Sequence, residues 1–324
     1  MKALLCKEYG PPDRLVLEEV PDLVPGDREV VIRAHAAGVN FPDGLIIQNK
    51  YQFKPALPFS PGGECAGVVE SVGAKVKHLR PGMRVMAFTT FGAFAEQVRA
   101  DAGGVIPMPD ELDFITASAF VLVYGTSYHA LVDRAALTSG DTLLVLGAAG
   151  GVGLAAIEIG KATGARVIAA ASSADKLAVC KAHGADALID YSADDLRAKL
   201  KELAPDGPNV IYDPVGGAYT EAAFRSIAWR GRLLVVGFAA GEIPKIPANL
   251  ALLKGASLVG VFWGDYAKRE PGRAAADLVQ MFQWLREHKL RPEISKTYPL
   301  ERGGEAIQAL LDRKATGKLV ITMT

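Results

Sequence analysis

The sequence predicts an α/β protein with two domains, one rich in β-strands and one built on a doubly wound parallel sheet. The chain has 324 residues, and a single hydrophobic core stops growing at about 250 to 300 residues. Short strand-like segments separated by Pro and Gly turns fill the first third. From Thr142 onward, short apolar segments alternate with stretches of helix length, which is the pattern of a doubly wound parallel sheet.

The first third contains several segments with strand-like patterns. They are Arg14 to Val20, Glu29 to Ala37, Glu64 to Gly73 and Met83 to Phe88. Residues 14–20 read RLVLEEV, and an alternation of apolar and polar residues predicts a half-buried strand. Because no helical pattern separates these segments, they favour a barrel-like antiparallel module.

The second part contains short apolar strands separated by segments of helix length. The strands read TLLVLG, RVIAAA, ALID, NVIYDP, RLLVVGF and SLVGVFW. After Trp263 the pattern predicts an amphipathic helix over Arg273 to Glu287, a short run at Thr297 to Leu300, a second helix and the terminal strand KLVITMT. We expect this tail to rejoin the first module.

The charge balance argues against nucleic acid or a membrane surface as the main partner. Lys and Arg total 36, and Asp and Glu also total 36, so no positive field attracts phosphates or anionic lipids. The longest apolar stretch, Thr142 to Ile159, is broken by four glycines and predicts no transmembrane helix. Lys7 and Glu8 interrupt the N-terminal apolar run too early for a signal peptide, which predicts a cytoplasmic protein.

The three cysteines, Cys6, Cys65 and Cys180, are scattered and show no CxxC spacing. This pattern suits a reducing compartment and argues against disulfides and against a thiolate zinc site. We expect each of them to be an ordinary buried thiol.

A glycine-rich segment gives the strongest local signal for a ligand. In Leu143 to Gly153, LLVLGAAGGVG, a buried strand runs into a glycine turn and then into a helix. This order predicts a Rossmann dinucleotide site, because glycines allow the backbone to approach a pyrophosphate at the positive end of a helix. The candidate contacts are Gly147, Ala149, Gly150, Gly151 and Val152. The motif is GxxGxxG, and the alternative is a glycine turn that serves packing alone.

The end of the next strand favours NADPH over NADH. Where a Rossmann protein that prefers NAD carries an acidic residue, this chain has Ala171, followed by Ser172 and Ser173. With no carboxylate to repel a 2′-phosphate, the two hydroxyls and Lys176 are expected to bind it, and Tyr191 is expected to flank it or the adenine. The alternative is that the serines cap the following helix and that Lys176 is solvated.

Several motifs together resemble the zinc-independent NADPH:quinone reductase branch of the medium-chain dehydrogenase/reductase superfamily. Besides the glycine turn, they are GVNFPD (38–43), PGGECAGVV (61–69), PGMRV (81–85), YDPVGG (212–217) and GKLVI (317–321). The resemblance implies a GroES-like catalytic domain built from residues 1–122 and 265–324 and a Rossmann NADPH-binding domain over 123–264. It also implies a cleft at their junction and a homodimer.

The chain departs from the zinc-dependent members of the superfamily at two ligand positions. Those enzymes place a Cys where this chain has Asn40 and a His where it has Gly63, and a catalytic zinc needs three protein ligands. The four-cysteine structural lobe is also missing, since residues 85–107 contain no Cys. We therefore expect no metal, and acceptors that are already electrophilic, namely quinones or enones.

By resemblance, Asn40 and Thr126 lie near the nicotinamide, where an amide and a hydroxyl can bond its carboxamide or the acceptor oxygen. Tyr51 is the aromatic expected to contact a quinone. Alternatives stay open, because Asn40 also suits a turn beside Pro42 and Tyr51 also suits a half-exposed loop.

Further cofactor contacts are expected where strands of the second part end, since open α/β sheets place ligands at carboxyl strand ends. The candidates are Gly237, Phe238, Val261, Phe262 and Trp263. Aromatic residues at strand ends belong more often to the core, and this is the alternative for Phe262 and Trp263. Lys318 resembles a family position near the cofactor, and its alternative is a solvated lysine near the C-terminus. His129 invites an acid/base role, but a structural histidine is the simpler interpretation.

The leading hypothesis is NADPH-dependent reduction of quinones by metal-free hydride transfer. A second hypothesis is reduction of the C=C bond of enones, enoyl or haloacrylate-type substrates, which needs the same fold and cofactor site. A third, from another class, is a non-catalytic NADPH-binding sensor or structural protein.

Overall fold

The computed structural model describes residues 1–323 and divides into two compact units. The first unit consists of Met1–Leu122 and Ile294–Thr324, and the second of Val123–Glu293. The boundary near residue 122 falls inside helix α3 (Val121–Tyr128). Within the described residues, no helix is both long and apolar enough to cross a membrane.

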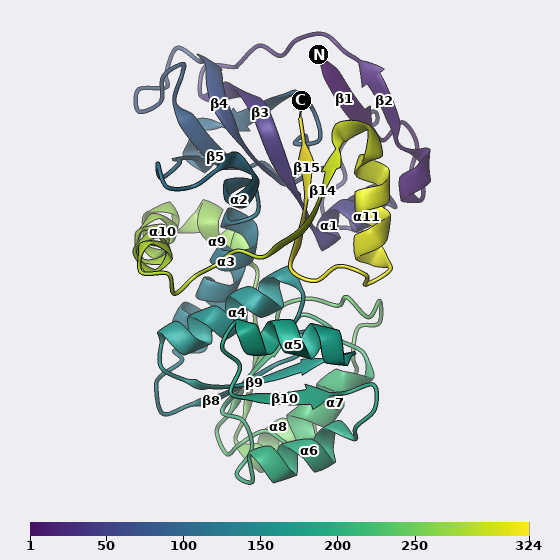
Figure 1. The fold of residues 1–324 in the computed structure, drawn as a ribbon, viewed down its shortest axis with the longest axis vertical. Helices are drawn as coiled ribbons and strands as arrows, with labels where there is room; N and C mark the ends of the chain where they lie inside the picture. Colours follow the sequence, from purple (N-terminus) through teal and green to yellow (C-terminus); the bar gives the residue numbers. More distant parts are fainter. Residues whose placement is uncertain (324) are drawn as a thin grey trace. The chain divides into compact units, whose positions relative to one another are not determined.

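The first unit is built on a seven-stranded sheet with the order β14-β15-β3-β4-β5-β7 and with β6 also paired to β3. Its strands are β3 (Glu29–Val39), β4 (Glu64–Val72), β5 (Arg84–Phe88), β6 (Gln97–Asp101), β7 (Val105–Pro107), β14 (Ile294–Pro299) and β15 (Lys318–Thr322). A separate pair contains β1 (Lys2–Leu5) and β2 (Val16–Glu19). All pairings in this unit are antiparallel except β14 with β15. The terminal strand therefore rejoins the first module, where it lies beside β3 (Figure 1).

Short helices complete the first unit. They are α1 (Phe41–Ile46), α2 (Phe114–Ser118), α11 (Gly303–Leu311) and the 3-10 turns Pro12–Arg14, Ala102–Gly104 and Leu300–Arg302. Alternate residues of β3, such as Val30, Ile32 and Ala34, enter one core together with residues of β4, β5 and β15. The core therefore draws on strands from both ends of the chain.

The second unit is a six-stranded parallel sheet with the order β10-β9-β8-β11-β12-β13. The strands are β8 (Thr142–Val145), β9 (Arg166–Ala171), β10 (Ala187–Asp190), β11 (Val210–Asp213), β12 (Arg232–Val235) and β13 (Ser257–Gly260). The chain order reverses between β8 and β11, and the carboxyl ends of the strands at such a reversal form the usual ligand site of a doubly wound sheet.

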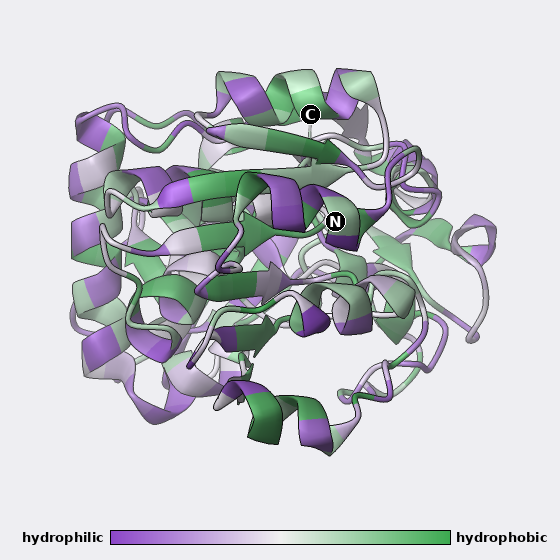
Figure 2. Ribbon diagram, turned by 90° about the horizontal axis from the view of Figure 1, so that it is seen from below, coloured by the Kyte–Doolittle hydropathy of each residue, from purple (hydrophilic) through white to green (hydrophobic). Residues whose placement is uncertain are grey.

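Helices cover both faces of this parallel sheet. They are α4 (Gly151–Ala162), α5 (Ala174–Ala182), α6 (Leu196–Leu203), α7 (Ala218–Arg225) and α8 (Ala248–Lys254). Figure 1 shows α4 and α5 on one face and α6, α7 and α8 on the other. Figure 2 shows that the helices mix hydrophilic and hydrophobic residues, as expected for helices that bury one side on a sheet.

The second unit extends to Glu293, whereas the domain predicted from the sequence ends at residue 264. The difference comes from α9 (Trp263–Arg269) and α10 (Pro271–Arg286), which pack within this unit. The Trp284 ring lies 5.6 Å from the Tyr128 ring, and the Tyr266 hydroxyl donates a 2.8 Å hydrogen bond to Asp277. Sequence periodicity identifies the helices but does not indicate which partner they cover.

Candidate functional site

The glycine turn after β8 has a shape that side chains would block at two positions. Gly147 has φ +57°, and a Cβ there would lie 2.7 Å from the Val215 side chain. A Cβ on Gly153 would lie 2.6 Å from the backbone oxygens of Gly147 and Ala148. Both glycines are therefore required by the chain itself, because they let the first turn of α4 approach the end of β8.

Gly150 differs, because nothing in the chain requires a glycine there. A Cβ on Gly150 would meet only the Gly147 carbonyl oxygen, at an ordinary 3.5 Å, and its φ is −76°. Gly150 is the N-cap of the twelve-residue helix α4, and no side chain caps that helix. The first amides of a helix have no intrahelical partner, so Gly151 and Val152 present backbone N–H groups at the positive end of α4. This end can hold an anion such as a pyrophosphate.

A buried carboxylate shapes the neighbouring turn after β11. Asp213 accepts hydrogen bonds from the backbone amides of Val215 and Gly216, at 2.8 and 2.9 Å, and from the Thr220 hydroxyl. This turn places the Val215 side chain over Gly147. Asp213 has no role among the residues predicted from the sequence. The signal for it was a short carboxylate ahead of Pro-Val-Gly-Gly, a typical turn-forming pattern.

The residues expected at the 2′-phosphate come together at the end of β9. The Lys176 Nζ lies 3.3 Å from the Ser172 hydroxyl, and the Ser173 hydroxyl accepts from the Lys176 amide at 3.4 Å as the N-cap of α5. The backbone amide of Tyr191 donates a 3.1 Å hydrogen bond to the Ala171 carbonyl oxygen. Ser173 therefore caps the helix, as the alternative interpretation holds, while Ser172 and Lys176 form a small polar cluster beside it.

Helix α3 is attached to the glycine turn through Ser127. The Ser127 hydroxyl donates to the Val152 carbonyl oxygen at 2.9 Å and lies 2.9 Å from the buried Tyr212 hydroxyl. Thr126, the predicted nicotinamide contact, precedes Ser127 and is half-buried. The structure thus brings Thr126 to the same end of the sheet as the glycine turn.

The predicted contacts after β12 and β13 divide into two groups. Gly237 and Val261 lie just beyond their strands. Their backbone amides donate hydrogen bonds to the carbonyl oxygens of Asp213, at 3.3 Å, and Val235, at 3.1 Å. Phe238 follows Gly237 and is half-buried, and Phe262 is 45% exposed. Trp263 instead starts α9, and its ring covers Gly125 of α3, where a Cβ would lie 2.6 Å from the ring. The Trp263 side chain is therefore a core group, as the alternative interpretation holds.

His129 lies in the interior of the second unit. Its ring stacks on Tyr266 with centroids 4.0 Å apart, and its Nδ1 lies 3.0 Å from an Asp133 carboxylate oxygen, off the line of a hydrogen bond. Burial lowers the pKa of His129. This packing supports the structural interpretation of His129.

In the first unit, Lys318 is buried, so the alternative of a solvated lysine is wrong. Its Nζ lies 2.9 Å from the Val39 carbonyl oxygen, 2.6 Å from Asn40 Oδ1 and 3.0 Å from Glu64 Oε1. The Asn40 Nδ2 donates in turn to Glu64 at 2.9 Å and to the Gly38 carbonyl oxygen at 3.2 Å. Both ends of the Asn40 amide are thus engaged within the chain.

Asp43 and Tyr51 lie next to this group. The buried Asp43 carboxylate accepts a 2.7 Å hydrogen bond from the backbone amide of Asn40. Its pKa is raised from 3.8 to about 7, chiefly by burial, against the hydrogen bond from Asn40 and the attraction of Lys318. Tyr51 is half-buried, its ring centroid lies 5.9 Å from that of Phe53, and burial and the Asp43 charge raise its pKa.

Residues 1–323 contain no group of three or more His, Cys, Asp and Glu side chains arranged to hold a metal ion. Asn40 and Gly63, the two positions at which the sequence predicts that zinc ligands are missing, carry an amide and no side chain. A Cβ on Gly63 would lie 3.9 Å from an Asp43 carboxylate oxygen. The three cysteines are free and buried.

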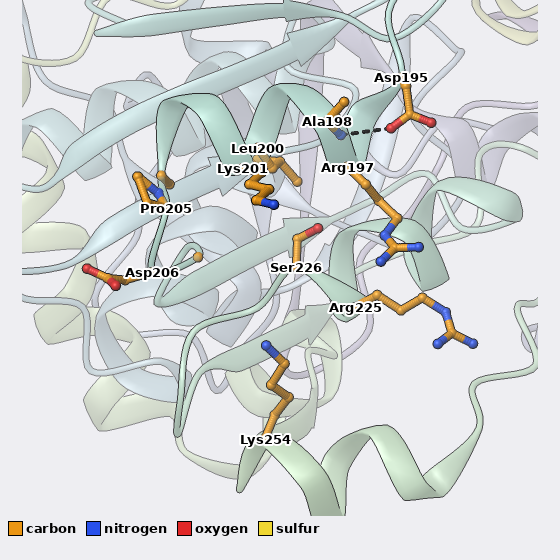
Figure 3. A pocket seen from close by; sticks show the side chains of 12 residues that line it. Asp195, Arg197, Ala198, Leu200, Lys201, Pro205, Asp206, Arg225, Ser226 and Lys254 are labelled. Atoms are coloured by element: carbon orange, nitrogen blue, oxygen red, sulfur yellow. Dashed lines mark hydrogen bonds between the residues drawn. The ribbon is translucent and has the colours of Figure 1, made fainter.

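A hollow of about 430 Å³ lies elsewhere on the second unit, among α6, α7 and α8 (Figure 3). Its residues Ala204 to Gly207 precede β11, so it lies at the amino ends of the strands, opposite the glycine turn. Lys201, Arg225 and Lys254 line it, and each belongs to the last turn of its helix. Cations there complement the helix carboxyl ends, which accounts for them without a ligand.

Comparisons with known proteins agree with this geometry. An alcohol dehydrogenase GroES-like domain matches residues 26–110, and a zinc-binding dehydrogenase domain matches residues 151–281. A quinone oxidoreductase-like protein 2 homolog of Nematostella vectensis is 40% identical over 327 residues, which cover 99% of this chain and 88% of the relative. The chain belongs to the zinc-independent quinone oxidoreductase branch of the medium-chain dehydrogenase/reductase superfamily. It is thus a medium-chain oxidoreductase.

Solved structures of this branch confirm the predicted fold class. A mycobacterial protein in complex with NADPH is 30% identical, with a TM-score of 0.93 and coverage of 99% of each chain. The Escherichia coli quinone oxidoreductase in complex with NADPH is 26% identical, with a TM-score of 0.92 and coverage of 99% of this chain and 100% of that chain. A GroES-like domain and a Rossmann domain in one chain are the architecture that the sequence predicts.

Proposed function

We propose that the protein reduces quinones with NADPH by hydride transfer that needs no metal ion. The observation that carries the proposal is the uncapped amino end of α4 at Gly150, a glycine whose missing side chain no contact in the chain explains. Close backbone approach by a pyrophosphate explains it. The complexes of the mycobacterial and E. coli relatives with NADPH support the same cofactor.

The residues of the second unit fit NADPH. Amides of Gly151 and Val152 would hold the pyrophosphate, and Ser172 with Lys176 would hold the 2′-phosphate by charge-assisted hydrogen bonds. Tyr191 would flank the adenine half. The Thr126 hydroxyl and the backbone at Gly237, Phe238 and Val261 would orient the nicotinamide. When bound, NADPH supplies the hydride.

The residues of the first unit fit the acceptor side of the reaction. Tyr51 presents a half-buried ring and hydroxyl for stacking on a quinone or hydrogen bonding to it. The Asn40 side chain supports the segment that carries Tyr51 and does not donate to a ligand, because its donors already serve Glu64 and Gly38. In this assignment, residues 1–122 with 294–324 form the catalytic domain and residues 123–293 the cofactor domain.

A second copy of the chain would cover the edge of the second unit. Strand β13 ends the described sheet and pairs only with β12, and an open edge is a template for another strand. Leu258 on this strand is 44% exposed, and Leu252 on α8 is 80% exposed. These features support the homodimer, which size-exclusion chromatography with light scattering would test.

The decisive experiment follows oxidation of NADPH and NADH by chelator-treated protein against ortho- and para-quinones, conjugated enones and simple aldehydes. We expect full activity after chelation, faster turnover of quinones than of the other acceptors, and a preference for NADPH. Turnover of enones alone would move the function to double-bond reduction. Tight NADPH binding without any turnover would favour the sensor or structural role.

A further inference from the structure

Three polar side chains in the first unit form a closed group that is almost fully buried. Asn40, Glu64 and Lys318 are 6%, 1% and 4% exposed, and we refer to them as the Lys318 cluster. One ammonium group, one carboxylate and one amide satisfy one another at 2.6 to 3.0 Å. The residues are remote in the chain, since 254 positions separate Glu64 from Lys318.

The cluster fixes the ends of several elements at one point. Lys318 is the first residue of β15, and its Nζ donates a hydrogen bond to the Val39 carbonyl oxygen at the end of β3. Glu64 is the first residue of β4, and its Oε2 accepts a 3.0 Å hydrogen bond from the Leu122 backbone amide. Burying charges is a poor way to gain stability, since apolar residues of similar volume often serve as well. The cluster is therefore better explained by the geometry that it imposes.

The segment that follows Asn40 starts at the cluster. Asn40 is the N-cap of α1, and its backbone amide donates a hydrogen bond to the Asp43 carboxylate. Helix α1 has only six residues, and a helix this short has little stability of its own. The segment then turns through a 2.9 Å bond from the Lys50 amide to the Leu45 carbonyl oxygen and reaches Tyr51.

We propose that Lys318 is a positioning residue, whose ammonium group holds Asn40 and Glu64 so that residues 40–51 present Tyr51 to the acceptor. The proposal rests on the proposed function, because Tyr51 acts on the acceptor only if quinone reduction takes place. Lys318 itself contacts neither reactant in this assignment. It acts through the side-chain amide of Asn40 and the backbone carbonyl group of Val39.

The test uses the intact protein and removes the buried pair as a whole. Lys318→Met alone would leave Glu64 buried without its counter-ion, so the informative variant is the double substitution Lys318→Met/Glu64→Gln, which is nearly isosteric. The matched control is Arg33→Met/Glu70→Gln, which removes a more exposed 2.6 Å ion pair in the same sheet, between β3 and β4. Amide hydrogen exchange and steady-state kinetics are measured for both variants.

We expect amides of residues 40–51 to exchange about tenfold faster in the Lys318/Glu64 double variant, while the strands keep their protection. The kcat/KM for quinones should fall by about tenfold or more, because small displacements of a positioning group are costly. The Kd for NADPH should stay within about twofold of the wild-type value, since the second unit is untouched. The control should match the wild type in all three measurements.

Unchanged exchange and kinetics in the Lys318/Glu64 double variant would overturn the proposal. Equal loss of protection throughout the first unit would also overturn it, because that result describes a purely structural pair. If the wild-type protein reduces no quinone, the proposed function fails, and the exchange pattern still decides whether Lys318 fixes residues 40–51.

Discussion

The glycine turn of the second unit and the Lys318 cluster of the first unit use polar groups in opposite ways. In the turn, backbone amides at the start of α4 have no capping side chain. In the cluster, the ammonium, carboxylate and amide groups satisfy one another. A ligand can bind where hydrogen-bonding groups are left open, whereas a closed group mainly holds its surroundings in place.

The largest effect is expected for Lys318→Met. The substitution leaves Glu64 buried beside Asn40 without its cation, and breaking a buried pair in this way costs about 3 to 5 kcal/mol of unfolding free energy. Urea unfolding of the intact protein measures it. The control is Lys314→Met, which removes an exposed 2.8 Å pair with Asp312 and should change stability by less than about 0.5 kcal/mol. Equal costs at the two lysines would remove the distinction between them.

Asp43 should make the first unit more stable in mild acid. Its pKa is raised from 3.8 to about 7 in the folded protein, so the folded state binds this proton more tightly than the unfolded chain. The resulting stability is complete below about pH 4 and is lost as the pH rises through 7. Between pH 5 and 7 the wild type should lose on the order of 2 kcal/mol relative to Asp43→Asn. A pH-independent difference in urea unfolding would contradict this assignment.

Gly150→Ala tests whether the turn is open for a ligand. The added Cβ meets only one atom of the chain, at 3.5 Å, so stability should fall by less than about 1 kcal/mol. Affinity for NADPH should fall about tenfold, because the methyl group occupies the space of the phosphate. Titration calorimetry provides the measurement, and Gly272→Ala in α10, where a Cβ meets no atom within 4 Å, is the control. Unchanged NADPH affinity would show that the turn serves packing alone.

Lys176→Ala should give the smallest effect, since Lys176 is only half-buried and the bond from its ammonium group to Ser172 is exposed. We expect affinity for NADPH to fall about fivefold and affinity for NADH to stay nearly constant, because only the former carries the 2′-phosphate. Fluorescence titration with both cofactors measures the ratio. An equal change for the two cofactors would place Lys176 outside the 2′-phosphate site.

The contrast also explains what the sequence could predict. The glycine turn is a local pattern, in which strand, glycines and helix follow within eleven residues of LLVLGAAGGVG. The parallel strands of the second unit are equally local, and the structure contains them as β8 to β13. The family motifs extended this prediction to the domain pair.

Groups formed over long distances could not be predicted in this way. Lys318 and Asn40 are separated by 278 positions, so nothing near either residue in the sequence reveals that the lysine is buried. Trp263 presented the same difficulty, because its position at a strand end did not show that its ring covers Gly125. The domain boundary at Glu293 likewise depends on contacts of α10 with α3 that periodicity cannot specify.

The pairing of β15 with β3 has a consequence for synthesis on the ribosome. The second unit, Val123–Glu293, is continuous and can fold as soon as it emerges, whereas the first unit must wait for residues 294–324. At roughly 5 to 20 residues per second, translation of residues 123–293 takes on the order of 10 to 30 s. During that time the edge of β3 that later receives β15 is unpaired. Nascent chains should therefore show a protease-resistant second unit before the first unit is complete.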